Sequence, residues 1–214
     1  VQHGGGRLEP VEKKMVGKEL TIPAGATADA EDGDLIAVET SRAPRLGLAT
    51  ARVVERLGSL KSERAVSLIA IHAHSIPSVF RRETEQEAEA AKPATLHGRE
   101  DWRHVPFVTI DPPDAKDHDD AVHAEPDTAR DNPGGYIVHV AIADVASYVN
   151  PGSALDREAL GRGNSVYFPD RVVPMLPERI SNDLCSLRAS EDRPALAVRM
   201  IIGADGRKRS HTFH

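Results

Sequence analysis

The sequence is poor in cysteine, and it has no long hydrophobic run. Cys185 is the only cysteine among the 214 residues, so no disulfide can form within the chain. Chains without disulfides are typical of reducing compartments, and we therefore expect a cytoplasmic location. No apolar run approaches the roughly 20 residues that a membrane-spanning helix requires. We expect neither a membrane span nor a signal peptide.

The sequence also has fewer basic residues than acidic residues. The chain has 33 acidic residues against 27 Lys and Arg, which gives a formal net charge of −6. Proteins that hold nucleic acid tightly by themselves are usually basic, so this balance argues mildly against tight RNA binding by the chain alone. It does not exclude nuclease chemistry, because acidic metal ligands contribute to the same count.

The first 60 residues contain no Phe, Tyr or Trp, but they contain three runs that are typical of strands. Residues 18–23 and 34–40 are the first two, and the third is 48–57, which Gly47 and Gly58 bracket. Short strands at close spacing, separated by Gly and Pro turns, suggest a small barrel.

A helical pattern follows the third run. Residues 63–72 carry Val66, Ile69 and Ala70 at helical spacing, with Ser62 as the expected N-cap. The very polar residues 83–91 predict a second, exposed helix, and we place a domain boundary near residues 93–100.

The remainder predicts buried strands around an acidic loop. The short apolar run 105–110 ends abruptly at Asp111, and residues 136–143 are almost continuously apolar, which suits a strand covered on both faces. Other expected elements are a strand over 121–124, a hairpin connection over 125–135, a helix over 156–162 capped by Ser153, and a strand over 193–202 closed by a turn at 203–206.

Five aspartates lie within ten positions of this loop: Asp111, Asp114, Asp117, Asp119 and Asp120. From composition alone, a solvated acidic run explains them as well as a functional site does. Their context favours a site, because they stand between two apolar runs. Two consecutive prolines after the first aspartate forbid a regular helix, so the loop must fold back in a defined way.

Carboxylates held close together repel one another unless some are protonated or a cation neutralises them. Ligands that are all oxygen select hard divalent ions such as magnesium or manganese. A calcium-binding EF-hand does not fit, because its glycine and glutamate positions, counted from Asp111, are Lys116 and Val122. A site that mixes carboxylates with His104, His118 or His123 stays open as an alternative, whereas we interpret His139 as a core or sheet-face histidine.

The segment from Thr109 to Val122 resembles the signature of the ribonuclease II / ribonuclease R family of 3′-to-5′ exoribonucleases. Further blocks that resemble the family follow in the same order, and their order across the chain argues against chance. They are residues 140–146, 155–159, 162–169, 174–177 and 184–187.

The resemblance implies a mixed α+β fold with a partial OB-type barrel, the end of a cold-shock domain, over residues 1–60. A helical linker over 61–100 and the first part of an RNB catalytic domain over 101–214 would follow. It also implies an enzyme that uses Mg²⁺, with Mn²⁺ as the alternative ion. Such an enzyme hydrolyses RNA from a single-stranded 3′ end to 5′-mononucleotides.

The resemblance assigns residue roles as well. Asp111, Asp117, Asp119 and Asp120 would be the catalytic carboxylates and metal ligands, of which Asp111 and Asp120 would hold the ion most directly. Loss of Asp119 would cost the most activity, and Asp114 falls at a spacer position without a role.

Two other side chains are interpreted with the help of the resemblance. Tyr167 matches the family tyrosine that orients the RNA 3′ end, although its pattern alone would make it a core aromatic. Cys185 lies in the last matching block, and we expect a buried structural thiol, because no catalytic histidine signature is near it.

Parts of the family pattern are missing. The stretch without aromatic residues departs from the cold-shock motif and leaves Arg42, Arg45, Arg52 and Arg56 as candidate phosphate contacts. A downstream glutamate, an arginine, a base-stacking aromatic and an S1 domain of the family have no counterpart. We therefore expect a fragment with weak or no activity of its own. The alternative is a non-catalytic RNA- or metal-binding module.

Overall fold

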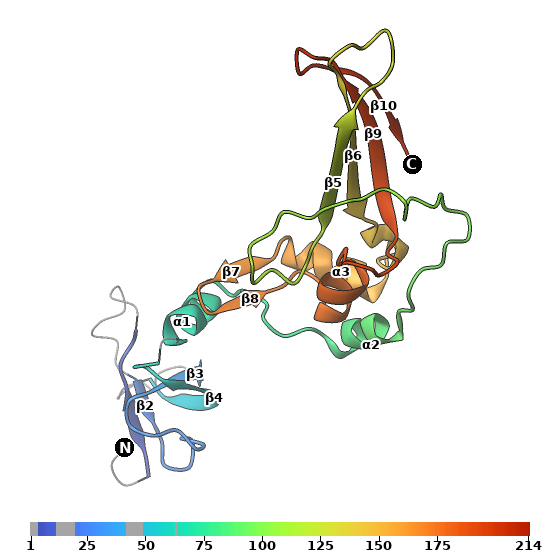
Figure 1. The fold of residues 1–214 in the computed structure, drawn as a ribbon. Coiled ribbons are helices and arrows are strands. Elements are labelled where there is room, and N and C mark those ends of the chain that lie inside the picture. The colour runs from blue at the N-terminus through green and yellow to red at the C-terminus, as the bar shows by residue number, and fades with distance from the viewer. Residues whose placement is uncertain (1–3, 12–19, 42–48, 63) are drawn as a thin grey trace. The chain divides into compact units, whose positions relative to one another are not determined.

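The computed structural model describes residues 4–11, 20–41, 49–62 and 64–214. The chain forms two compact units (Figure 1). The first unit comprises Val1–Ser78 and Tyr167–Val173, and the second comprises Val79–Val166 and Pro174–His214. Within the described part of the chain, no helix is both long and apolar enough to cross a membrane.

The N-terminal part of the first unit, up to Ser59, contains two antiparallel strand pairs. Strand β1 (Gly6–Leu8) pairs with β2 (Leu20–Ile22), and β3 (Asp34–Thr40) pairs with β4 (Ala51–Ser59). A single parallel bridge between Thr21 and Thr50 links the two pairs. The register of β3 against β4 shifts twice, and such irregularities bend and twist a strand pair as a small barrel requires. This is the expected OB-like part of the fold.

The sequence predicted β2, β3 and β4, although residues 18, 19 and 48 of the predicted runs lie outside the described residues. Two of the four candidate arginines are held by acids: Arg52 pairs with Glu39 at 2.9 Å, and Arg56 pairs with Asp34 at 2.6 Å. Arg42 and Arg45 also lie outside the described residues.

Helix α1 (Ala65–Ala73) corrects two expectations. Its N-cap is Arg64 instead of Ser62, whose hydroxyl accepts a hydrogen bond from the Arg64 amide before the helix begins. The helix buries Ala65, Ser67 and Ile71, whereas Val66 is 73% exposed. The run from 65 to 71 is apolar on nearly every face, so spacing alone could not select the buried face. Ser67 instead donates a hydrogen bond to Asp170, in the turn between β7 (Val166–Phe168) and β8 (Arg171–Val173).

The second unit is built on a four-stranded antiparallel sheet in the order β10-β9-β6-β5 (Figure 1). Its strands are β5 (Asp120–Pro126), β6 (Tyr136–Ala143), β9 (Ala195–Ile202) and β10 (Lys208–Phe213). The first three were predicted. The expectation that β6 is covered on both faces is wrong, because it buries His139 and Ala141 while Tyr136 and Ile142 are 51% and 46% exposed. The sheet packs through one face of β6.

Helices gather at the end of the sheet where β5 and β9 begin (Figure 1). They are α2 (Arg82–Ala90), the 3₁₀ turn η2 (Val145–Ser147), α3 (Ala154–Arg162) and the π-helix η3 (Arg179–Leu184). Their shared core consists of Ala88, Ala143, Tyr148, Leu155, Leu176, Ile180, Leu184 and Cys185. This core supports the start of β5, which is where the aspartates lie.

Three sequence predictions concern residues in or next to this core. Ser153 caps α3 as predicted, since its hydroxyl accepts a hydrogen bond from the Asp156 amide at 3.2 Å. The expectation that α2 is simply exposed is wrong, because Thr84 and Ala88 are each 1% exposed. Cys185 is the buried thiol that we predicted, and burial raises its pKa to about 11, so it stays protonated at neutral pH.

His139 is the buried histidine of the sheet. It is 7% exposed and lies edge-on against Trp102, with ring centroids 5.3 Å apart, and stacks on His123. Its Nδ1 atom has no hydrogen-bond partner among the described residues. Burial lowers the pKa of His139 from 6.5, and the positive charges of His123, Arg199 and His214 lower it further against an opposing effect of Glu125.

This environment predicts acid sensitivity. Between the lowered pKa of the folded chain and 6.5, the unfolded chain binds a proton at His139 that the folded chain does not bind. The free energy of unfolding should therefore fall as the pH drops below about 6.5. Urea unfolding measured across this pH range tests the expectation. His139→Gln should reduce the slope, whereas the matched change of exposed His97 to Gln should leave it unchanged. Equal slopes in both variants would refute the assignment to His139.

Candidate metal centre

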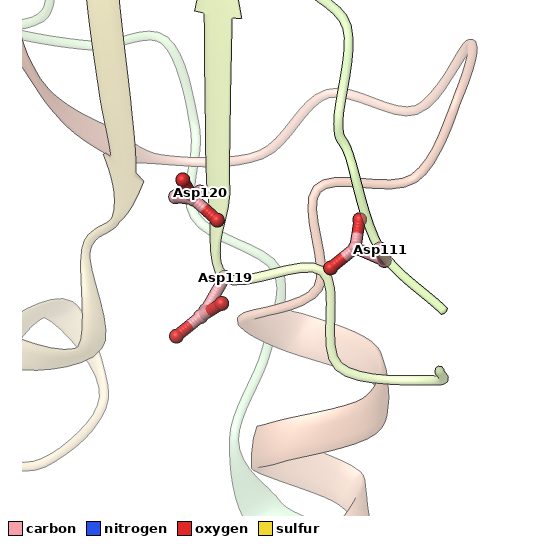
Figure 2. Close-up of side chains that lie close together, drawn as sticks. All are labelled: Asp111, Asp119 and Asp120. Atoms are coloured by element: carbon pink, nitrogen blue, oxygen red, sulfur yellow. The ribbon is translucent and has the colours of Figure 1, made fainter. Parts of the chain in front are cut away.

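Three of the predicted carboxylates meet where β5 begins. Asp111, Asp119 and Asp120 each place one carboxylate oxygen within 4.8 Å of the other two (Figure 2). Figure 2 shows Asp119 and Asp120 on one segment and Asp111 on the segment beside it. Asp119 and Asp120 are exposed and Asp111 is half-buried, so the group is open to an ion from solvent.

Backbone pairing fixes the two aspartates at the strand end. Asp120 is the first residue of β5 and lies opposite Ile142 of β6. The carbonyl of Asp119 accepts a hydrogen bond from the Ala143 amide at 2.9 Å. Ala143 itself belongs to the buried core, so the backbone that carries these two aspartates is bonded to a packed part of the unit.

A single bridge brings Asp111 beside them. Val108 and Val122 exchange both backbone hydrogen bonds, at 3.0 and 2.9 Å, and Asp111 follows three residues later. The expectation that residues 105–110 form a buried strand is wrong. Only Val108 pairs, and Val108 and Ile110 are 56% and 85% exposed. β5 is an edge strand with a free side, but Pro106 has no amide hydrogen to donate to a ladder there, so pairing does not extend from Val108 to Pro106.

The charge state of Asp111 follows from its neighbours. His118 Nδ1 lies 2.8 Å from Asp111 Oδ2 and donates to it. This hydrogen bond, together with one from Thr109, holds the pKa of the Asp111 carboxyl below its usual range. Asp111 is therefore ionised at neutral pH and offers a fixed anionic oxygen.

The other predicted residues lie outside this group. Asp117 belongs to the same loop, but its carboxylate is not among the three that approach one another, and its role as a ligand stays a prediction. Asp114 is exposed and also outside the group. Tyr167 lies on β7, and at 67% exposure it is not the core aromatic that its pattern alone suggested.

The donor set is entirely carboxylate, which fits Mg²⁺ or Mn²⁺ and excludes metals that prefer sulfur ligands. Among the described residues the group contains no histidine, so the mixed site is not formed. His118 instead contacts Asp111 from outside the group. No local signal in the sequence distinguished His118 from the other histidines near the loop.

The loop also borders a pocket of about 570 Å³. Lys116, Arg179 and Arg188 line it, and both arginines pair with Asp183. Within the described part of the chain, Lys116 has no acidic partner. The pocket therefore contains a cation from the loop that carries the aspartates, together with the acids Glu178 and Asp183.

Comparison with known proteins identifies the family of the chain. A family model of the RNB domain matches residues 99–214, and a cold shock domain model matches residues 8–80. The first match covers more than half of the chain, which therefore belongs to the RNB family, as the sequence blocks predicted. The predicted boundaries near residues 60 and 100 stay predictions.

The similarity extends to ribonuclease R. The ribonuclease R of Vibrio parahaemolyticus is 40% identical over 208 residues, which cover 95% of this chain and 24% of that protein. The chain thus spans about a quarter of the length of the curated relatives it matches.

Solved structures show the same likeness. Mycoplasma genitalium RNase R in complex with ribose-methylated single-stranded RNA matches 98% of this chain, and 35% of its own, with a TM-score of 0.80 at 27% identity. Yeast Ssd1, described as a pseudonuclease, matches 99% of this chain and 28% of its own with a TM-score of 0.63. At 18% identity, the similarity to Ssd1 is evidence of a shared fold alone.

Proposed function

We propose that the chain carries the metal-binding part of the catalytic site of a 3′-to-5′ exoribonuclease. The substrate would be single-stranded RNA, hydrolysed from its 3′ end to 5′-mononucleotides. The observation that carries the proposal is the convergence of Asp111, Asp119 and Asp120 at the start of β5 in an RNB domain. The name of the ribonuclease R relatives and the RNA bound to the Mycoplasma protein support RNA as the substrate. A cytoplasmic location belongs to the same proposal.

Each of the three carboxylates contributes differently to holding Mg²⁺ or Mn²⁺. Asp111 is kept ionised and oriented by His118, so it provides the fixed ligand. Asp119 and Asp120 are exposed and can reach both an ion and a phosphate next to it. When bound, divalent ions supply Lewis-acid stabilisation of the charge that develops on a phosphate during hydrolysis. We retain Asp117 as a fourth ligand from the same loop.

Two further side chains would position the substrate, Tyr167 and Lys116. Tyr167 is 67% exposed, and by the family resemblance it would orient the RNA 3′ end by stacking on a base. Lys116 offers a charge for a backbone phosphate.

The second candidate is an RNA- or metal-binding module without turnover. Two observations favour it: the chain spans only about a quarter of its relatives, and its net charge is −6. The fold does not decide between the candidates, since a pseudonuclease shares it.

Incubation with a 5′-labelled single-stranded RNA separates the candidates. The chain is tested with Mg²⁺ or Mn²⁺, with a chelator, and as the Asp119→Asn/Asp120→Asn double variant. A ladder that shortens from the 3′ end, needs the metal and is lost in the double variant is the result expected of the exoribonuclease. Cuts inside the RNA would contradict that activity. Metal-dependent RNA binding without any product would favour the binding module.

A further inference from the structure

The loop that carries the aspartates is held from its inner side by Ser186. This residue is 0% exposed and follows the end of η3 by two positions. Its hydroxyl donates a hydrogen bond to the Lys116 carbonyl at 2.8 Å and accepts one from the His118 amide at 3.1 Å. The next residue, Leu187, donates its amide to the His118 carbonyl at 2.7 Å. Three hydrogen bonds therefore fix the backbone of residues 116–118.

The loop lies outside regular secondary structure. No helix or strand includes residues 109–119, so no regular backbone ladder satisfies their polar groups. Buried amides and carbonyls need partners, and a serine hydroxyl can accept and donate at the same time. Ser186 uses both capacities on one loop, which a smaller or purely apolar side chain could not do.

Two of the carboxylates, those of Asp111 and Asp119, are connected to this fixed backbone. The side chain of His118 reaches Asp111 at 2.8 Å. Asp119 follows His118 directly, and its carbonyl is bonded to Ala143 at 2.9 Å. A shift of the backbone at 116–118 would therefore move Asp111, through the imidazole, and Asp119, through the chain, away from each other.

We propose that Ser186 is a positioning residue of the metal centre, which keeps Asp111 and Asp119 within reach of one ion. The inference rests on the proposed function, because Ser186 would support the same carboxylates that are proposed to bind the ion. Ser186 does not touch the ion or the substrate. It acts through the backbone of Lys116 and His118.

The test compares Ser186→Ala with Ser181→Ala in the whole 214-residue chain. Ser181 is a matched control, because it lies half-buried in η3 and its hydroxyl contacts Leu176, Pro177 and Asn182 but not the loop. Mn²⁺ affinity is measured by calorimetric titration. Supporting residues of metal sites typically contribute 10–100-fold in affinity, so Ser186→Ala should weaken Mn²⁺ binding by about 10-fold or more and Ser181→Ala by less than about twofold.

Amide hydrogen exchange of the metal-free chain gives an independent measurement. Ser186→Ala should speed exchange at the His118 amide, which loses its acceptor, while exchange in β6 and β9 stays unchanged. Should the alanine variant fail to fold, Ser186→Cys preserves the approximate volume and weakens both hydrogen bonds. It should show the same two effects at smaller size.

Unchanged His118 exchange in either Ser186 variant would overturn the inference. Equal losses of Mn²⁺ affinity in the Ser186 and Ser181 variants would also overturn it, because they would indicate general destabilisation. A wild-type chain that binds no Mn²⁺ would contradict the proposed function instead, and the exchange rate of the His118 amide would still decide the role of Ser186.

Discussion

Replacing Asp119 with asparagine is expected to weaken Mn²⁺ binding by more than about 100-fold. The variant loses an anionic oxygen from a group in which three carboxylates lie within 4.8 Å of one another. Residues that merely support a metal site typically contribute 10–100-fold, so a direct ligand should exceed that range. Calorimetric titration of wild type and variant at one ionic strength measures the difference.

Asp114→Asn is the matched control for that prediction. Asp114 belongs to the same loop, its replacement removes the same charge, and it is exposed and outside the group. It should change Mn²⁺ affinity by less than about twofold. If both variants weaken binding equally, the loop attracts cations only by its overall charge and the proposed coordination is wrong. The metal-free Asp119 variant should unfold no more easily than wild type, because it removes one of three repelling charges.

Leu184→Ala is expected to lower the free energy of unfolding of the second unit by about 2–5 kcal/mol. Leu184 is 1% exposed and ends η3, in the core cluster with Leu155 and Ile180. Truncation leaves a cavity that the surrounding helices can fill only in part. The single tryptophan, Trp102, belongs to the second unit, so its fluorescence during urea unfolding reports on this unit.

Leu160→Ala provides the comparison for this core substitution. Leu160 lies on α3 but is 83% exposed, so the same truncation removes almost no buried contact. Its effect should stay within about 0.5 kcal/mol. Similar losses from both leucines would mean that the cluster around Leu184 is not the core of this unit.

The sequence was informative where function leaves a local signature. Asp111, Asp119 and Asp120 were singled out because acids follow one another between two apolar runs, and the structure brings these three together. Strands such as β3 and β6 were recognised from their apolar pattern. Strand β10 was missed because all six of its side chains are exposed, and its composition is mostly polar.

The supporting contacts of the site could not be predicted in this way. Ser186 bonds His118 across 68 positions, and no local spacing encodes such a contact. The buried face of α1 was misjudged for a related reason: several of its faces are apolar, and tertiary contacts select among them. The bridge at Val108 likewise depends on its partner Val122 and not on the pattern of its own segment.

Diffraction from crystals grown with Mn²⁺, recorded near the manganese absorption edge, tests the central claim most directly. We expect an anomalous difference peak at the carboxylate oxygens of Asp111, Asp119 and Asp120, and its loss in the Asp119→Asn/Asp120→Asn variant. A map with no peak among these three residues at saturating Mn²⁺, or with manganese held only elsewhere on the chain, would contradict it.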